Sequence, residues 1–246
     1  MQILKNKLLI GTSGWHYSSW LDSFYPKNLN KNKWLQYYSE FFNTVEVNSS
    51  FYHLVKDEVF KKWFEQTPDN FKFCVKASRY ITHIKKLIDC AEPFKRLSDS
   101  ACKLEHKLEL FLFQMPPNMK KDIERLNIFL KSIPGNYKYV FEFRNESWFT
   151  KEVYEMLDEY GAAITISDSP DFPHHEVITG SICYIRMHGS TQLYSSKYSN
   201  EELEKIRDII KNNLKKDIAT YIYFNNDAFC NAIKNARELL ELTENL

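Results

Sequence analysis

The sequence predicts an α/β protein built as a TIM-like (β/α)8 barrel. Short apolar runs rich in β-branched and aromatic residues recur eight times, and most of them precede a segment with helical periodicity. Successive runs begin about 30 residues apart, which is the length of one βα unit. Eight such units account for nearly all of the 246 residues. We therefore expect one barrel domain over residues 1–246.

The expected elements follow one another in strand–helix order. Predicted strands begin near Leu8, Thr44, Phe71, Leu110, Tyr139, Ala162, Ile182 and Ala219. Predicted helices span residues 34–42, 57–66, 93–106, 120–133, 150–160, 200–213 and 227–241. Thr150 and Ser199 mark two of the helix starts, because each stands just before acidic residues that favour the exposed N–H groups of a first turn.

Two connections depart from this pattern. The interval between the strands at Ala162 and Ile182 is short and contains two prolines and a glycine, so we expect the sixth helix to be missing or reduced to one turn. The loop after the first strand, residues 13–33, is long and aromatic. In a barrel this loop lies on the face where the strands end.

Composition excludes several classes of protein. Lys and Arg total 33 against 32 Asp and Glu, so the formal net charge of +1 supplies no bulk attraction to nucleic acid or membranes. The five cysteines form no Cys-x-x-Cys pair, which argues against a disulfide framework and favours the cytoplasm. No apolar run is long enough to span a membrane, and Lys5 and Lys7 favour a first strand over a signal peptide. We expect neither a membrane nor a protein partner.

Polar residues end most of the predicted strands. Side chains two positions apart in a strand share a face, so the inward positions follow from the alternation. Barrel enzymes place their sites at the C-terminal mouth, where these inward residues meet. The expected set is Glu46, Asn48, Lys76, Gln114, Glu142, Arg144, Asp168, Arg186, His188 and Asn225.

This set balances three carboxylates against three permanent cations, with a histidine that titrates near neutral pH. One interpretation is a structural plug, since buried charges must be paired. The other is a site in which Lys76, Arg144, Arg186 and His188 hold an anion. In that interpretation one carboxylate acts as the general acid or base. Glu142 is the best candidate base, held ionised by Arg144 or Lys76, and Glu46 is a further candidate catalytic residue. Asp168 is expected to orient His188.

Two loops favour phosphate as the anion. Residues 188–191 follow the seventh strand, and Asn225 and Asn226 precede the eighth helix. Barrel loops at these two places often bind phosphate through backbone N–H groups and a helix N-terminus. The carboxylate of Asp227 opposes an anion there.

A metal site is an open alternative. Glu46, Glu142, Asp168 and His188 are ligand types that suit Mg, Mn or Zn, although the neighbouring cations oppose a divalent ion. Glu46 and Glu142 could also form a glycosidase carboxylate pair, but strands two and five lie almost opposite each other in a barrel. The cofactor is therefore unknown, with a divalent metal as one alternative.

Aromatic residues are expected above the mouth. Trp15, Tyr17 and Trp20 belong to the first loop and Trp148 to the fifth, and together they should form one wall. Such a wall either packs a lid or stacks on a base or sugar. Stacking beside an anion site would favour a nucleotide or a nucleic-acid end as ligand.

Long motifs extend from residue 8 to about 240. They are GTSGWHY (11–17), NTVEVNSSFY (43–52), VKASRYITH (75–83), FQMPP (113–117), FEFRNESW (141–148), YIRMHG (184–189) and YFNNDA (223–228). In these motifs the chain resembles the domain of unknown function 72 family, also called YecE-like. The resemblance implies a TIM-like barrel and adds Arg79, Thr82 and His83 to the candidate site, but it implies no reaction. Cys230 stands where the family pattern has a glycine; if that glycine admits a ligand, this chain binds it differently.

Two hypotheses follow. The first is an enzyme acting on an anionic, phosphorylated or nucleic-acid-derived ligand by carboxylate and histidine acid–base or metal-assisted chemistry. The second is a non-catalytic barrel that binds an anionic small molecule or a nucleic-acid end.

Overall fold

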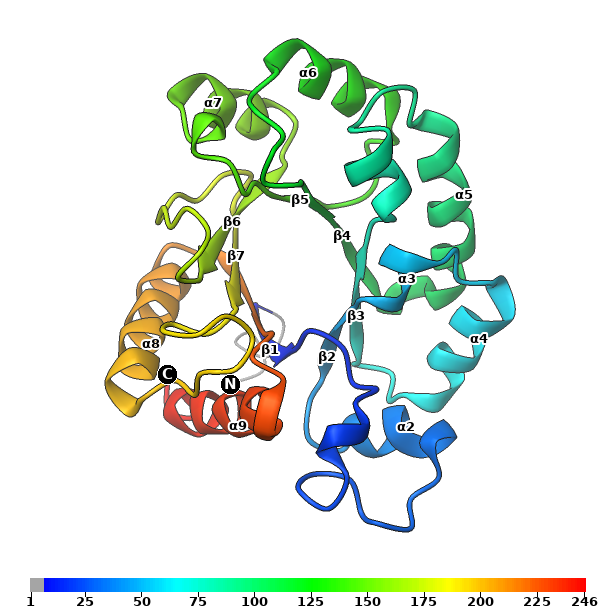
Figure 1. Cartoon of the computed structure of the whole chain (residues 1–246), viewed down its shortest axis with the longest axis vertical. Coiled ribbons are helices and arrows are strands. Elements are labelled where there is room, and N and C mark those ends of the chain that lie inside the picture. The colour runs from blue at the N-terminus through cyan, green and yellow to red at the C-terminus, as the bar shows by residue number, and fades with distance from the viewer. Residues whose placement is uncertain (1–6) are drawn as a thin grey trace.

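The computed structural model describes residues 7–246, in which eight parallel strands form a barrel surrounded by helices (Figure 1). The strands are β1 (Leu8–Thr12), β2 (Thr44–Val47), β3 (Lys72–Lys76), β4 (Leu108–Gln114), β5 (Tyr139–Glu142), β6 (Ala163–Asp168), β7 (Ile182–Met187) and β8 (Ala219–Phe224). Consecutive strands pair from β2 through to β8, and β1 pairs with β8. The predicted TIM-like barrel is confirmed. Residues 1–6, part of the segment expected to be a strand rather than a signal peptide, lie outside the described residues.

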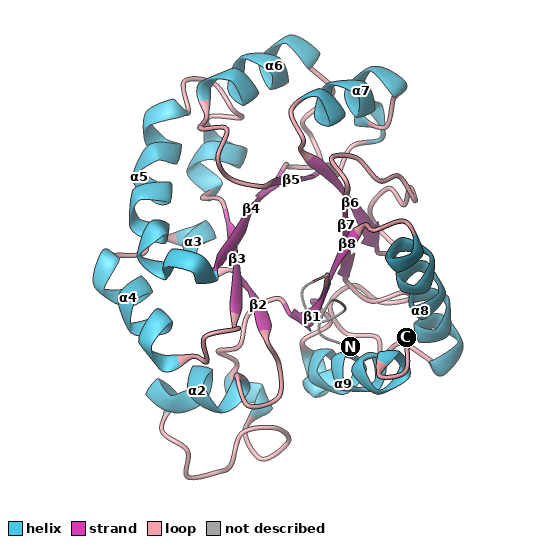
Figure 2. Cartoon of the chain, turned by 180° about the vertical axis from the view of Figure 1, so that it is seen from behind, coloured by secondary structure: helices cyan, strands magenta, loops and turns pink. Residues whose placement is uncertain are grey.

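Helices cover the outside of the strands (Figure 2). They are α2 (Trp34–Tyr38), α3 (Ser49–Tyr52), α4 (Asp57–Gln66), α5 (Ala91–Ala101), α6 (Ile123–Ser132), α7 (Lys151–Glu159), α8 (Asn200–Lys215) and α9 (Asn231–Thr243). Ser199 begins α8 with a reciprocal pair of hydrogen bonds to Glu202, as its sequence predicts. No helix joins β6 to β7, which confirms that the sixth helix is missing. Among residues 7–246, no helix is long and apolar enough to traverse a bilayer.

The last helix begins four residues later than expected. Phe229 and Cys230 have φ of 56° and 59°, the left-handed conformation that glycine adopts most easily. The side chain of Cys230 is buried and does not line the cavity at the mouth. This backbone conformation gives a structural reason for a glycine at this position.

The barrel closes between β1 and β2 with little direct pairing. A single bridge joins Ser13 to Glu46. Below it, the hydroxyl of Tyr38 accepts a hydrogen bond from the Thr12 N–H at 3.0 Å and donates one to the Thr44 carbonyl at 3.1 Å. Gly11 permits this close approach, because a Cβ there would lie 2.4 Å from the Thr44 oxygen.

The inward faces match the sequence alternation on six of the seven strands for which it was predicted, and differ on β6. Apolar and aromatic side chains fill the lower barrel, including Cys74, Leu112 and Tyr184, and polar residues lie above them. On β6 the inward residue is Ala163, so Thr165 and Ser167 share its face, whereas Ile166 packs outside. The expectation that Asp168 faces inward was therefore wrong. A strand buried on both faces carries apolar residues on both, so its phase cannot be read from hydrophobicity.

Candidate active site at the mouth of the barrel

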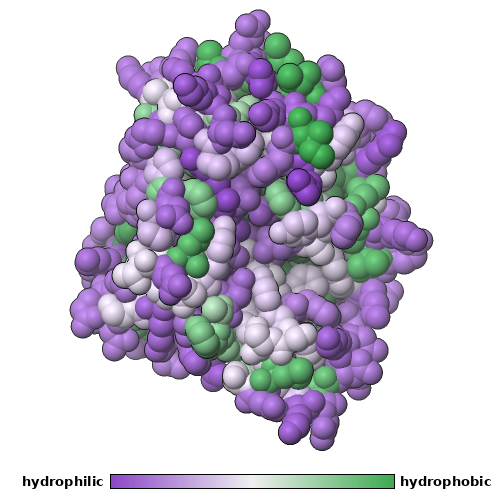
Figure 3. Space-filling view, viewed as in Figure 1, coloured by the Kyte–Doolittle hydropathy of each residue, from purple (hydrophilic) through white to green (hydrophobic). Residues whose placement is uncertain are grey.

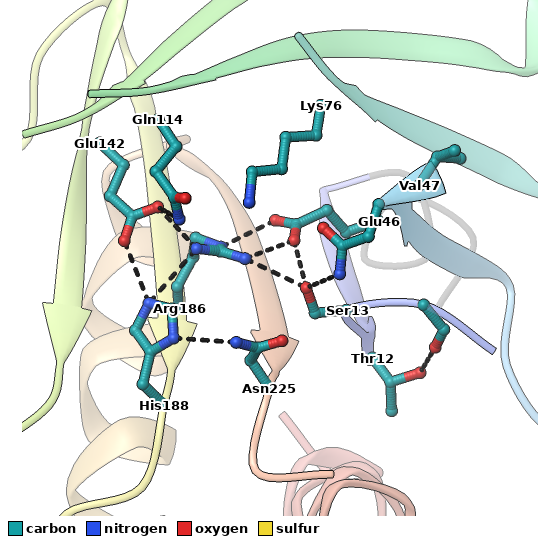
Figure 4. Close-up of polar contacts among 12 residues, drawn as sticks. Thr12, Ser13, Glu46, Val47, Lys76, Gln114, Glu142, Arg186, His188 and Asn225 are labelled. Atoms are coloured by element: carbon teal, nitrogen blue, oxygen red, sulfur yellow. Dashed lines mark hydrogen bonds and ion pairs between the residues drawn. The ribbon is translucent and has the colours of Figure 1, made fainter. Parts of the chain in front are cut away.

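A buried arginine lies at the centre of the polar layer (Figure 4). Arg186, from β7, donates from Nε and Nη2 to the two carboxylate oxygens of Glu46, at 2.9 and 2.6 Å. Its Nη1 donates to Glu142 at 2.6 Å. Nη2 also donates to the hydroxyl of Ser13 at 3.1 Å. Because Arg186 is 1% exposed and both glutamates are fully buried, this cluster is a desolvated charge network.

Glu46 is held ionised by its surroundings. Besides Arg186, it accepts hydrogen bonds from the hydroxyls of Tyr184, at 2.8 Å, and Ser13. Burial opposes its charge, but Arg186 and Lys76 more than offset that effect and keep the pKa of Glu46 below its ordinary value.

Glu142 is saturated with donors. Gln114 donates to one of its oxygens at 2.7 Å, and Arg144 donates to the other at 3.2 Å. Despite its burial, Arg186 and Arg144 hold the pKa of Glu142 well below the usual range. A carboxylate bound by this many donors is a poor proton acceptor, so these contacts fit positioning better than the predicted role of base.

His188 is neutral and lies beneath other side chains. Its Nε2 is 3.1 Å from Glu142, and its Nδ1 is 3.1 Å from the amide nitrogen of Asn225. Burial and the nearby Arg186 lower its pKa to about 4. The edge of the Phe172 ring covers it from the β6–β7 connection. His188 therefore carries no positive charge for an anion at neutral pH.

A cavity of about 530 Å³ opens above this network, at the hollow in the centre of the face shown in Figure 3. A volume of this size suits a small-molecule ligand. Its lining brings together nine of the predicted site residues, Tyr17, Asn48, Lys76, Arg79, His83, Gln114, Arg144, Arg186 and Asn225, and adds Asp227. Phe51, Tyr52 and Tyr194 complete the wall.

Lys76 lies at the base of the cavity without a partner. Its amine is 4.3 Å from the centre of the Phe51 ring, and no hydrogen-bond or ion-pair acceptor within residues 7–246 contacts it. Burial and the positive charge of Arg186 lower its pKa to about 7. The amine points into the cluster without a marked contact in Figure 4.

Asp227 was expected from the sequence only to oppose the binding of an anion. It lines the cavity, and its buried Oδ1 has no hydrogen-bond partner in the described part of the chain. Burial is the largest cause that raises its pKa, to about 7. The signal was present in the sequence, because Asp227 follows the polar end of the eighth strand directly.

Asp168 does not join the site. Its carboxylate accepts a hydrogen bond from Tyr198 at 3.1 Å, and only its backbone oxygen contacts the chain at His188. It therefore does not orient the imidazole, a role that Asn225 fills. Among the described residues no three His, Cys, Asp or Glu side chains form a metal-binding group. Arg186 stands between the two glutamates that would have been ligands, so this donor set does not fit a divalent metal.

Some N–H groups of the two loops expected to bind phosphate are hydrogen-bonded within the protein. The Gly189 N–H donates to Tyr198, and the Ala228 N–H donates to the Tyr194 carbonyl. Asn226 is fully buried and its amide donates to Ser196 and Asn235, which ties the loop after β7 to α9. Asn226 is therefore part of the scaffold, and the N–H groups of Gly189 and Ala228 are not free to bind an anion.

The expected aromatic wall is only partly formed. Trp20 and Trp148 are fully buried, and their indole nitrogens donate to backbone carbonyls at 3.1 and 2.8 Å. They are core residues. Trp15 and Tyr17 line a second groove of about 700 Å³ together with Tyr52 and Trp63, although Trp15 is itself largely buried in the core. This groove adjoins the cavity, since Tyr17, Asn48 and Tyr52 line both.

Comparisons with known proteins agree with this architecture. A family model described as "Protein of unknown function DUF72" matches residues 9–245. UPF0759 protein YunF of Bacillus subtilis is 28% identical over 96% of this chain and 95% of its own, and UPF0759 protein YecE of Escherichia coli is 27% identical over 77% of each. The crystal structure of a DUF72 family protein from Thermotoga maritima superposes with a TM-score of 0.86 at 29% identity, covering 96% of this chain and 99% of that one. The chain belongs to the DUF72 family.

Proposed function

We propose that this protein is an enzyme that acts on an anionic, phosphorylated ligand at the C-terminal mouth of its barrel. The observation that carries the proposal is a set of basic side chains around the cavity whose donors are wholly or partly unused within residues 7–246. The side chains of Lys76 and Arg79 make no hydrogen bond there, and that of Arg144 donates only from Nε, to Glu142. Glu46 and Glu142 are already shared with Arg186. The cavity therefore favours negative charge.

Phosphate is the anion that this geometry suits best. Arginine presents a planar fork of donors that matches phosphate oxygens, and hydrogen bonds between charged groups are the stronger ones. Arg144 lies over the Phe172 ring at 3.9 Å, which holds its guanidinium in one orientation at the cavity. Arg79, on the opposite loop after β3, is exposed and free to close on a ligand.

Two groups in the cavity have pKa values suited to proton transfer near neutral pH. Asp227 and Lys76 both have values of about 7, so each is present in both protonation states. General acid–base catalysis works best when the pKa lies near the working pH. Glu142 and His188, in contrast, act as positioning residues beneath the cavity.

The adjoining groove favours a ligand with a flat or sugar-like part. Trp15 and Tyr17 provide its aromatic surface, and Lys31 and Lys62 stand at its edge. Stacking of a base on such a side chain contributes about 1–3 kcal/mol. A nucleotide, or a nucleic-acid end, has both the phosphate and the flat group.

Binding and turnover test the proposal separately. Inorganic phosphate and a panel of phosphate esters should raise the melting temperature of the wild type, because a ligand of the native state stabilises it by mass action. Arg79→Gln should weaken phosphate binding about tenfold, since a hydrogen bond to a charged group is worth about 1.5–3 kcal/mol. Arg96→Gln is the matched control, because Arg96 lies exposed on α5, paired with Glu92.

The outcomes separate the two hypotheses. Product formed from a phosphate ester or nucleic-acid end, lost in Asp227→Asn, supports the enzyme. Phosphate binding without turnover of any compound in the panel would favour a non-catalytic binding barrel. No thermal shift at many millimolar phosphate would end the proposal.

A further inference from the structure

We propose that the amine of Lys76 is a nucleophile that forms an imine with the carbonyl group of a small phosphorylated aldehyde or ketone. This inference rests on the proposed function for the phosphate and adds the class of substrate. It is carried by the position of the amine, the contrast with a second buried lysine, and a proton donor in the same cavity.

The position of Lys76 is that of a nucleophile presented from a rigid strand. It ends β3, faces the barrel interior, and is 7% exposed. A buried ammonium normally finds acceptors, because leaving it unpaired is costly. Lys76 instead has the ring of Phe51 on one side and the open cavity on the other. Nothing in residues 7–246 uses its three N–H donors.

Lys107 shows what a structural buried lysine looks like in the same protein. It is 3% exposed, and its amine donates to the carbonyl oxygens of Phe64 and Thr67, both at 2.7 Å, and to the Thr67 hydroxyl. Its ammonium is thus anchored, and it lines no cavity at the barrel mouth. Burial alone therefore does not explain the free amine of Lys76.

The charges around Lys76 favour the neutral amine, which is the nucleophilic form. Burial is the largest effect, and Arg186 and Arg144 add to it, so that the pKa is about 7. The glutamates oppose this shift only in part, because their charge is shared with Arg186. A large fraction of the amine is therefore unprotonated at physiological pH.

Imine formation can be written with groups that line this cavity. The nitrogen lone pair bonds to the carbonyl carbon, and the π electron pair moves to the oxygen, which takes a proton. The nitrogen then releases a proton, its electron pair forms the C=N bond, and the hydroxyl leaves as water with a proton from an acid. The protonated imine that results returns one proton to the conjugate base of that acid. Asp227 lines the same cavity, has an unpartnered Oδ1 and is partly protonated near neutral pH, so it suits this role. Amine and carbonyl give imine and water, with no oxidation or reduction.

Reductive trapping tests the inference on the intact wild-type chain. The protein is incubated with glyceraldehyde 3-phosphate or dihydroxyacetone phosphate and sodium cyanoborohydride, and the adduct is located by intact mass and peptide mapping. We expect one adduct per chain, on Lys76, formed at least tenfold faster than on any other lysine. Its rate should rise with pH to a plateau with a midpoint near pH 7, whereas exposed lysines respond only near pH 10. Lys76→Met should lose the adduct, and Lys72→Met, at the other end of β3, should keep it.

The results distinguish this inference from the proposed function. An adduct spread over surface lysines, or absent while the phosphorylated compounds still raise the melting temperature, would overturn the imine and leave phosphate binding intact. Equal trapping by glyceraldehyde and dihydroxyacetone without phosphate, unaffected by Arg79→Gln, would keep the imine and remove phosphate recognition. Peptide mapping of the trapped wild-type protein distinguishes these outcomes even if Lys76→Met does not fold.

Discussion

Removing the central guanidinium should destabilise the protein more than any other single change in the polar layer. Arg186→Met keeps much of the side-chain volume and deletes the cation shared by Glu46 and Glu142, both fully buried. Breaking a buried ion pair by removing one partner costs about 3–5 kcal/mol, because an uncompensated charge remains. For a chain of this length 1 kcal/mol shifts the melting temperature by about 2–4 °C. We expect a fall of about 6–20 °C at pH 7.

The pH dependence of this loss of stability follows from the direction in which the pKa values of the two glutamates are shifted. In the wild type the pKa values of Glu46 and Glu142 are lowered, so their contribution to stability is present above about pH 4.5 and is lost as pH falls through the folded values. Without Arg186, burial raises the folded pKa of Glu46. The free-energy cost of burying ionised Glu46 is then largest at high pH, and it decreases as the carboxylate is protonated at lower pH. The deficit relative to the wild type should shrink between pH 8 and pH 5.

Thermal unfolding followed by circular dichroism at several pH values measures both effects. Arg96→Met, which removes an exposed arginine paired with Glu92, is the control and should change the melting temperature little. Arg186→Met combined with Glu46→Gln should recover part of the loss, because one buried charge is gone. A deficit below about 2 °C at pH 7, or one that grows toward pH 5, would refute the reasoning.

Three further predictions concern other parts of the structure. Tyr38→Phe removes the hydroxyl that joins β1 to β2 and should cost about 1–3 kcal/mol, seen as a lower melting temperature and faster exchange of the Thr12 amide proton. Asp227→Asn should match the wild type in melting temperature near pH 4 and exceed it at pH 8, because a raised folded pKa means stability that is lost as pH rises toward 7; equal curves at both pH values would contradict the burial of that carboxyl. Trp15→Ala should weaken binding of a nucleotide more than binding of inorganic phosphate, measured by titration calorimetry, whereas Trp148→Phe should lower stability and leave both affinities unchanged.

Much of the candidate site could be expected from the sequence because strands have a simple period. On β5 and β7 the polar residues Glu142 and Arg186 share a face with the apolar or aromatic residues before them, and that face points inward. Parallel strands end at one mouth, so these side chains had to meet. The same rule failed on β6, where apolar residues occupy both faces and Asp168 was assigned to the wrong one.

The roles within the cluster could not be expected in the same way. Alternation places a side chain on a face but says nothing of which partners it reaches. Arg186 and Lys76 are both cations at strand ends, yet one is shared by two carboxylates and the other has no acceptor among the described residues. Trp15 and Trp148 are both loop tryptophans packed in the core, yet only Trp15 also reaches the wall of a groove.

The sequence by itself determined the barrel, its missing sixth helix and the residue types gathered at its mouth, because hydrophobic periodicity and the spacing of successive segments can be read along the chain. Only the tertiary structure decided which of those residues are charged, free and accessible. Burial and the distances between groups from different strands set the pKa of Lys76, Glu142 and Asp227, and those distances exist only once the barrel has closed.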